Sequence, residues 1–176
     1  MRIISGKYRG RTIVPPRNLR ARPTTDFAKE NLFNILTNLI DFEECTVLDL
    51  FAGTGSISLE FVSRGCNRVI SVEREPSHHT FIYKVKEQLG ETNWIPLRAD
   101  VFRYIEKCHD TFDLIFADPP YALTRLAELP DLILGKGMLS ENGLLILEHG
   151  KDHSFAEHPR FEQERVYGSV HFSFFR

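Results

Sequence analysis

Apolar and polar residues alternate along the chain in two patterns, one typical of buried strands and one typical of amphipathic helices. Short, continuous apolar runs bounded by polar or turn-forming residues occur at residues 45–51, 68–73, 94–98, 112–117 and 143–149. Helical periodicity is found between them, near residues 55–64, 76–89, 101–108 and 123–135. Continuous apolar strands that alternate with helices predict a mostly parallel sheet covered on both faces.

Two more segments flank this alternation. Residues 24–40 predict an amphipathic helix, with Thr24, Thr25 or Asp26 available as N-cap. Its apolar positions fall largely on one face and are Phe27, Leu32, Phe33, Ile35, Leu36, Leu39 and Ile40. The tail, residues 169–176, alternates polar and apolar side chains and predicts an antiparallel edge strand. A length of 176 residues with 42% hydrophobic content favours one well-packed core.

Charge is distributed unevenly, although the net charge of the chain is only −2. Residues 1–22 contain no acid and carry seven basic side chains, namely Arg2, Lys7, Arg9, Arg11, Arg17, Arg20 and Arg22. A basic arm on an acidic body indicates a polyanionic partner such as nucleic acid, and the alternative is a solvated cationic tail. We therefore divide the chain into a basic arm, residues 1–23, and a body, residues 24–176, with a linker around residues 15–23.

Several classes of protein are disfavoured by composition. The sequence has no apolar run of about 18 residues and no signal-peptide centre, so we expect a cytoplasmic protein without a membrane partner. Three widely spaced cysteines predict neither a disulfide framework nor a zinc site; they are Cys45, Cys66 and Cys108. The neighbouring histidines 149, 153 and 158 lack a matched set of carboxylates or thiols, so we interpret them as surface loop residues and expect no metal.

The first predicted strand ends in a glycine-rich turn. In "DLFAGTGS", residues 49–56, Gly53 and Gly55 allow a tight turn and a close approach of the backbone to a ligand. Eighteen residues after Gly55, the second strand ends in Glu73, close to the spacing at which an acid binds ribose hydroxyls. Ligands of open parallel sheets bind at the carboxyl ends of the strands. The turn therefore predicts a nucleoside-containing cofactor.

Two acids favour S-adenosylmethionine as that cofactor. The third glycine of a dinucleotide motif is replaced by Ser58, and Asp49 suits an ammonium group better than a pyrophosphate. After the third strand, the Asp100 carboxylate is placed to accept from an adenine amine, and the Val101 backbone to read the ring edge. Each acid alone is more often a helix N-cap or turn residue. Acids at three successive strand ends instead indicate a ligand site.

The fourth strand runs into the sequence Asp118-Pro119-Pro120-Tyr121. Each proline fixes its own φ and forces the preceding residue out of helical geometry, so the loop is predicted to be stiff. The Asp118 carboxylate and the Pro119 carbonyl could accept both N–H groups of a nucleobase amine, which favours the pyramidal nitrogen needed to attack a sulfonium methyl. Tyr121 could stack on the base, which must be unpaired or flipped. The alternative is a structural Pro-Pro turn capped by Asp118.

With these motifs in this order, the chain resembles the class I methyltransferases that act on amino groups. Four flanking blocks, "RIISGKYRGR", "RPTTDFAKENLFNIL", "LEFVSRG" and "YGSVHFSFFR", narrow the resemblance to the bacterial RsmD type, the 16S ribosomal RNA guanine-N2 methyltransferases named for guanine 966. The resemblance covers essentially the whole chain. It implies a Rossmann-like, seven-stranded and mostly parallel α/β sheet with an antiparallel C-terminal edge strand, and a monomer that acts on 16S ribosomal RNA, free or within a small-subunit particle.

The resemblance also implies roles for individual residues. The cofactor would be wrapped by Asp49, Phe51, Gly53 and Gly55, with its ribose held by Glu73 and its adenine by Asp100 and Val101. The target guanine would be held by the catalytic loop, Asp118, Pro119, Pro120 and Tyr121. RNA would be contacted by Arg2, Lys7, Arg9, Arg11, Arg22 and Thr24, and the segment 22–25 would meet RNA or border the site.

Three other functions remain open at this point. A DNA adenine-N6 methyltransferase shares the DPPY loop, but it normally needs a separate target-reading region for which 176 residues leave little room. A nucleotide-binding oxidoreductase is disfavoured by Ser58 and by the absence of a His or Tyr-Lys proton relay at a strand end. A non-catalytic RNA-binding assembly factor with the same fold predicts that no methyl group reaches RNA.

Overall fold

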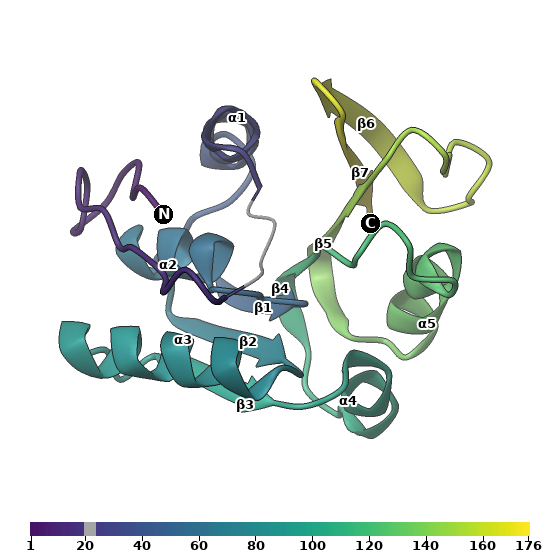
Figure 1. The fold of residues 1–176 in the computed structure, drawn as a ribbon. Helices are drawn as coiled ribbons and strands as arrows, with labels where there is room; N and C mark the ends of the chain where they lie inside the picture. Colours follow the sequence, from purple (N-terminus) through teal and green to yellow (C-terminus); the bar gives the residue numbers. More distant parts are fainter. Residues whose placement is uncertain (20–23) are drawn as a thin grey trace.

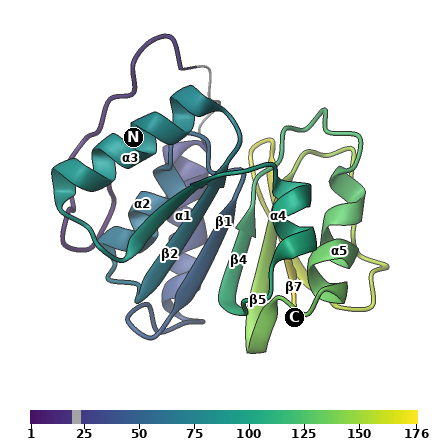
Figure 2. The same ribbon diagram turned by 90° about the horizontal axis from the view of Figure 1, so that it is seen from below.

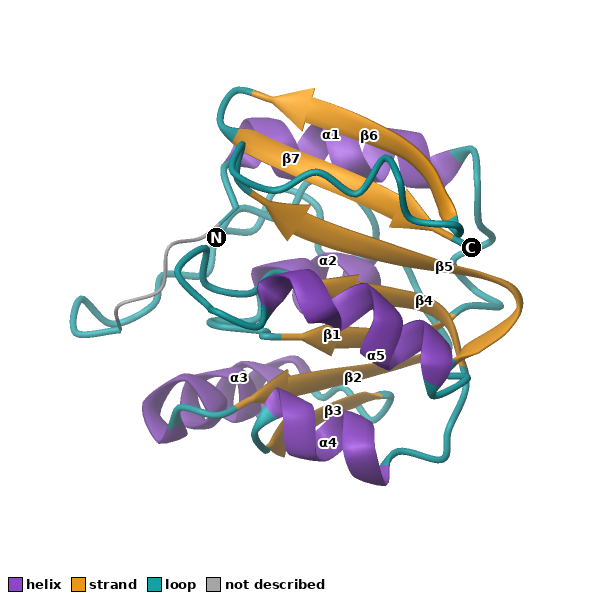
Figure 3. Ribbon diagram, turned by 90° about the vertical axis from the view of Figure 1, so that its right-hand side faces the viewer, coloured by secondary structure: helices purple, strands orange, loops and turns teal. Residues whose placement is uncertain are grey.

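A computed structural model of the chain describes residues 1–19 and 24–176, and these residues form one seven-stranded sheet. The strand order is β3-β2-β1-β4-β5-β7-β6 (Figure 3). The bounds are β1 Thr46–Leu50, β2 Arg68–Glu73, β3 Trp94–Arg98, β4 Phe112–Ala117, β5 Leu139–His149, β6 Phe161–Tyr167 and β7 Val170–Phe175. The first five strands pair in parallel, and β7 and β6 join as an antiparallel pair. The predicted fold class is confirmed.

The helices lie in two layers, one on each side of the sheet (Figures 1 and 2). Their bounds are α1 Asp26–Thr37, α2 Ser56–Ser63, α3 Pro76–Leu89, α4 Val101–Lys107, the short 3-10 helix η1 Leu126–Glu128, and α5 Leu129–Gly135. Apolar side chains of α1, α2 and α3 pack on one face of the sheet, and those of α4 and α5 pack on the other. Each face therefore has its own core, as the continuous apolar strands predicted. None of the helices described is long and apolar enough to cross a membrane.

The C-terminal edge of the sheet differs from the prediction in one respect. The tail forms β7, but β7 lies between β5 and β6 instead of at the edge, which is formed by residues 161–167. This edge strand was missed because none of its seven residues is buried, so its sequence "FEQERVY" carries no apolar alternation. The tail strand could be predicted because its side chains alternate between polar and apolar, and five of its six residues are buried.

The first helix also differs in part from its predicted apolar face. Thr25 is the N-cap and accepts from the Ala28 N–H at 3.2 Å. Phe27 is 64% exposed because it projects from the face opposite the buried one, and it packs edge-on against Tyr167 on β6. Leu39 lies beyond the last helical residue, so helical periodicity no longer determines its direction.

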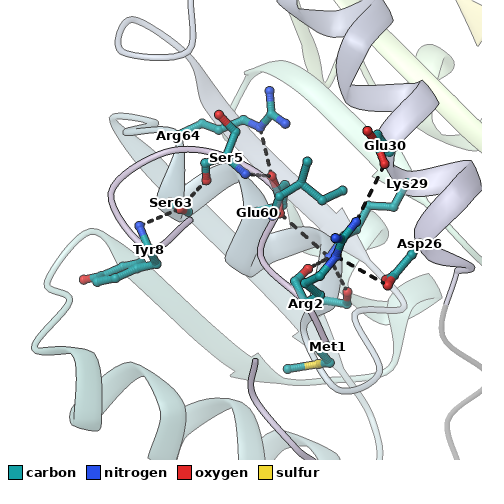
Figure 4. A network of polar contacts seen from close by, with 12 residues as sticks. Met1, Arg2, Ser5, Tyr8, Asp26, Lys29, Glu30, Glu60, Ser63 and Arg64 are labelled. Atoms are coloured by element: carbon teal, nitrogen blue, oxygen red, sulfur yellow. Dashed lines mark hydrogen bonds and ion pairs between the residues drawn. The ribbon is translucent and has the colours of Figure 1, made fainter. Parts of the chain in front are cut away.

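The N-terminal segment packs on α2, and Figure 4 shows the contacts that hold it there. Glu60 of α2 is fully buried, and its carboxylate accepts from the backbone N–H groups of Ile4 and Ser5, both at 3.0 Å. The same carboxylate pairs with Arg64 at 3.1 Å and with buried Lys29 of α1 at 3.8 Å. The first residues of the predicted arm are therefore part of the packed body, whereas residues 20–23 lie outside the described residues.

Candidate active site

One cavity of about 600 Å³ opens at the carboxyl ends of the parallel strands. It is lined by the turn after β1, the end of β2, the start of α4, the loop after β4 and the end of β5. The structure thus brings together nearly all of the predicted cofactor and catalytic residues. Those that line the cavity are Asp49, Phe51, Gly53, Glu73, Asp100, Val101, Asp118, Pro119, Pro120 and Tyr121.

The turn after β1 needs three left-handed backbone positions in five residues. Phe51, Gly53 and Gly55 have φ values of 62°, 59° and 83°. Gly53 lines the cavity as predicted, but Gly55 is not among its lining residues. A Cβ at Gly55 would lie 3.0 Å from Ile82 and 3.3 Å from the Trp94 ring. Gly55 is therefore required for the turn and for packing against α3 and β3, and its contact with the cofactor stays a prediction.

Asp49 lines the cavity and is 1% exposed. One of its oxygens, Oδ2, accepts from both the backbone N–H and the hydroxyl of Ser58. Burial and, to a smaller extent, the nearby Glu73 raise the pKa of this carboxyl to about 7, although the two hydrogen bonds from Ser58 oppose the rise. Ser58, noted in the sequence only as a missing glycine, therefore supports the acid assigned to the cofactor ammonium.

Glu73 joins the end of β2 to the glycine turn. Its Oε2 accepts from the Gly53 N–H at 2.7 Å, and its Oε1 accepts from the Glu75 N–H at 2.8 Å. These two bonds hold the carboxylate in one orientation at the cavity wall. The sequence analysis gave a helix cap as the alternative to a ligand contact for Asp100. Asp100 does have that role, because it is the N-cap of α4 and accepts from the Arg103 N–H at 3.1 Å. It also lines the cavity, so both roles apply to the same residue.

The loop after β4 is anchored on both sides. The Asp118 N–H donates to the Leu50 carbonyl of β1 at 3.4 Å, and the Pro120 carbonyl accepts from the Leu123 N–H at 2.9 Å. A Cβ at Gly150 would lie 3.2 Å from the Tyr121 ring, so glycine at 150 makes room for that ring. The loop therefore contacts the end of β1 and the residue after β5, on two sides of the cavity.

Glu148 is a site residue that the sequence analysis missed. It lies near the end of β5, is 4% exposed and lines the cavity. Its Oε2 accepts from the Thr24 hydroxyl at 2.9 Å, and its Oε1 accepts from the Tyr121 hydroxyl at 3.3 Å. The sequence did contain a signal for this residue, which is an acid at the carboxyl end of β5, the strand beside β4. Thr24 is itself buried and lines the cavity, so it borders the site, the second of the two places predicted for segment 22–25.

The predicted RNA-contacting cations have different surroundings. Arg2 lies 3.7 Å from both Asp26 and Glu30, and Lys7 pairs with Glu91 at 2.5 Å. Arg9 and Arg11 are exposed, and the Arg11 guanidinium lies over the Tyr8 ring. Arg22 lies outside the described residues.

The three histidines grouped by sequence differ in their polar partners, although the rings of His149 and His153 both contact Phe155. His158 bonds Asp131 at 3.0 Å, whereas His149 is fully buried and bonds Ser173 at 2.7 Å. His149 lies instead in a group with Glu164 and His171 whose ligand atoms are all within 4.8 Å of one another. Burial lowers the pKa of His149, which favours its neutral form.

The strand order, the left-handed glycine turn after β1 and the acids at the ends of β1, β2 and β4 define a class I methyltransferase. Comparison with known proteins identifies the family within that class. A family model described as "Conserved hypothetical protein 95" matches residues 1–176, and the chain belongs to this family. Together with relatives named as small-subunit ribosomal RNA methyltransferases D, this match confirms the resemblance to RsmD-type proteins.

Similar proteins cover most of the chain. "Putative rRNA methyltransferase YlbH" of Bacillus subtilis is 36% identical over 160 residues, which are 86% of this chain and 84% of that protein. "Ribosomal RNA small subunit methyltransferase D" of Escherichia coli is 29% identical over 173 residues, 97% of this chain and 86% of that protein. A solved structure, "Putative methyltransferase yhhF from Escherichia coli", has a TM-score of 0.86 at 27% identity and covers 99% of this chain and 96% of its own.

Proposed function

We propose that this protein methylates the exocyclic N2 amine of a guanine in 16S ribosomal RNA, with S-adenosylmethionine as cofactor. The observation that carries the proposal is the meeting of the Asp118 loop with the acids at the ends of β1 and β2 in one cavity. Curated relatives named as small-subunit ribosomal RNA methyltransferases support the RNA substrate.

The cavity suits this cofactor by volume and by donor set. About 600 Å³ lies within the range of small-molecule sites, roughly 300–1,000 Å³. The Asp49 carboxylate suits an ammonium group, Glu73 suits ribose hydroxyls, and the apolar side chains of Phe51, Val101 and Phe102 suit an adenine ring. When bound, S-adenosylmethionine supplies an electrophilic methyl group on a sulfonium sulfur.

The residues of the loop prepare the amine for reaction. The Asp118 carboxylate and the Pro119 carbonyl accept from the two N–H groups of the guanine amine, which localises the nitrogen lone pair. Tyr121, held between Gly150 and Glu148, provides an aromatic face for the base. With the cofactor bound, the amine would take its methyl group and leave S-adenosylhomocysteine, and Asp118 would be a suitable acceptor for the proton that the nitrogen then loses. Oriented acceptors of this kind act in the transition state.

One experiment tests the proposal and separates it from the alternatives. The protein is incubated with labelled S-adenosylmethionine and unmodified small subunits, free ribosomal RNA or duplex DNA, and the products are digested and identified by mass spectrometry. We expect N2-methylguanosine in RNA, and the preferred RNA form identifies the particle or the naked RNA as substrate. N6-methyladenine in DNA would assign the runner-up activity. If no substrate acquired a labelled methyl group, the proposal that this protein is catalytic would be overturned.

A further inference from the structure

A buried carboxylate faces the same cavity as the catalytic loop without a role in the chemistry described above. Glu148 belongs to β5, the strand that pairs with β4 through Ala117 and Leu147. Leu147 packs in the core beneath α4 and α5, so the next side chain, Glu148, points to the opposite face, where Thr24 precedes α1. The carboxylate therefore borders the space into which the DPPY loop presents Asp118.

Two hydroxyls are among the groups that position this carboxylate. Thr24 donates to Oε2 at 2.9 Å and Tyr121 donates to the other oxygen at 3.3 Å. Both donors can rotate their hydrogens and can also accept, so they can hold the carboxylate and adjust when a base enters. The contact with Tyr121 links Glu148 directly to the loop that receives the target amine.

The chemistry of Glu148 discriminates between purines. An ionised carboxylate only accepts hydrogen bonds. The Watson–Crick edge of guanine presents two adjacent donors, N1–H and the N2 amine, whereas adenine presents an N1 acceptor beside its N6 amine. A flipped base is read through this edge. A carboxylate beside the amine-binding loop therefore favours guanine and repels the N1 lone pair of adenine.

We propose that Glu148 is the residue that selects guanine: its carboxylate accepts from N1–H of the target base while Asp118 and Pro119 accept from the amine. This inference rests on the proposed function and deepens it, because the DPPY loop recognises only an amino group and does not distinguish the two purines. A solely structural Glu148, tying α1 to the loop and β5, is the competing explanation.

The test uses a base analogue that keeps the nucleophile and changes only the recognised edge. 2-Aminopurine retains the amine at position 2, but its N1 is an unprotonated acceptor and it lacks the oxygen at position 6. The RNA substrate, free or assembled as the first experiment identifies, is prepared with guanine or 2-aminopurine at the target position, and kcat/KM is measured for each. The wild-type protein should prefer guanine by about 100-fold or more, because a polar site rejects an analogue that leaves it unpaired.

The substitution Glu148→Gln should reduce that preference to about 10-fold or less, because the amide N–H can donate to the analogue's N1. Glu141→Gln is the matched control: it changes an exposed residue of the same strand, far from the cavity, and should keep the wild-type ratio. An unchanged ratio in Glu148→Gln, with both substrates slowed equally, would show a structural role and overturn the inference.

Two further measurements separate a change in base selection from a loss of folding. Binding of S-adenosylhomocysteine by each variant, measured by calorimetry, verifies that the cofactor site is folded. If Glu148→Gln does not fold, the wild-type protein alone still tests the inference, because equal use of guanine and 2-aminopurine would overturn it. Failure of the proposed function has a different signature, which is the absence of methyl transfer to guanine by the wild-type protein.

Discussion

Ser58 donates both its backbone N–H and its hydroxyl to the same oxygen of Asp49, at 3.1 and 2.5 Å. The Ser58 hydroxyl also contacts the Ser71 hydroxyl at 2.6 Å, which accepts from the Trp94 indole N–H at 2.8 Å. Because the Ser58 hydroxyl gives its one hydrogen to Asp49, it accepts from the Ser71 hydroxyl, so the hydrogen bonds run from Trp94 to Ser71, from Ser71 to Ser58 and from Ser58 to Asp49. A buried relay thus orients the carboxylate assigned to the cofactor.

The relay predicts a binding defect when its last hydroxyl is removed. Ser58→Ala should weaken binding of S-adenosylhomocysteine by about 1–2 kcal/mol, or roughly 5- to 30-fold, because Asp49 loses a donor in a buried site. Isothermal titration calorimetry at pH 8 measures this. Ser154→Ala, at an exposed position, is the control and should bind as the wild type does. Wild-type affinity in Ser58→Ala would show that the relay does not support the site.

Cofactor affinity should depend on pH through Asp49. Burial raises the pKa of its carboxyl from the ordinary 3.8 to about 7, so the free protein increasingly holds a proton there as the pH falls below 7. An ammonium ligand requires the ionised form, and affinity should therefore fall up to about tenfold per pH unit below pH 7. Calorimetric titrations between pH 5.5 and 8 measure the slope, and Asp49→Asn should bind weakly with little slope. A flat wild-type profile would contradict the assignment.

The same shift has an opposite consequence for the stability of the free protein. Between pH 4 and 7 the folded state holds more protons at Asp49 than the unfolded state does, so this group's contribution to the free energy of unfolding decreases as the pH rises. Urea denaturation of the wild type and of Asp49→Asn across this range should show a shallower decline for the variant. Equal slopes would indicate that the folded carboxyl has an ordinary pKa.

The catalytic role of Asp118 predicts a loss of turnover with little loss of cofactor binding. Asp118→Ala should slow transfer by roughly 3 kcal/mol or more, because an oriented acceptor for the amine is removed. Single-turnover assays with labelled cofactor measure the rate, and calorimetry with S-adenosylhomocysteine provides the control for an intact cofactor site. Turnover that survives the substitution would remove Asp118 from the proposed mechanism.

The attachment of the N-terminal segment to α2 predicts a large stability effect. Glu60→Gln leaves the buried ammonium of Lys29 without its countercharge and should lower the free energy of unfolding by about 3–5 kcal/mol. Urea denaturation measures the loss, with Glu30→Gln, half-exposed on α1, as a control that should change it by less than about 1 kcal/mol. Comparable losses in the two variants would mean that the Glu60 contacts add little.

RNA binding by the exposed cations of the N-terminal segment should show in the salt dependence of the dissociation constant. Replacing Arg9 and Arg11 by Gln should reduce the slope of log Kd against log salt by about one unit for each lost phosphate contact. Lys107, the last residue of α4, and Lys136, directly after α5, lie at the end of the sheet away from the cavity and provide a charge-matched double substitution. An unchanged slope for the Arg9 and Arg11 variant would identify the segment as a solvated cationic surface.

Local features of the sequence were sufficient to predict much of the fold and the acids at the strand ends of the site. The bounds of β2, β3, β4 and α3 agree with the predicted ranges, because each is a periodic run closed by turn-forming residues. The acids at strand ends were found for the same reason: parallel strands bring their carboxyl ends to one edge, so position along the chain implies position in space.

Features formed by distant or mostly polar segments were not predictable in this way. The edge strand β6 has no apolar alternation, and the basic arm gave no sign that buried Glu60 would hold its backbone. The turn motif also gave no sign that the missing Cβ of Gly55 makes room for Ile82 and Trp94.

The sequence by itself determined the alternation of strands and helices, the glycine turn and the stiff DPPY loop, because backbone preferences and apolar periodicity are local. Only the tertiary structure decided that Glu148 meets Tyr121 and Thr24, residues 27 and 124 positions away along the chain. Such a contact depends on how α1 and the β4 loop pack over the end of β5. The proposed recognition of the amino group therefore depends on a local motif, whereas the proposed choice of guanine depends on tertiary packing.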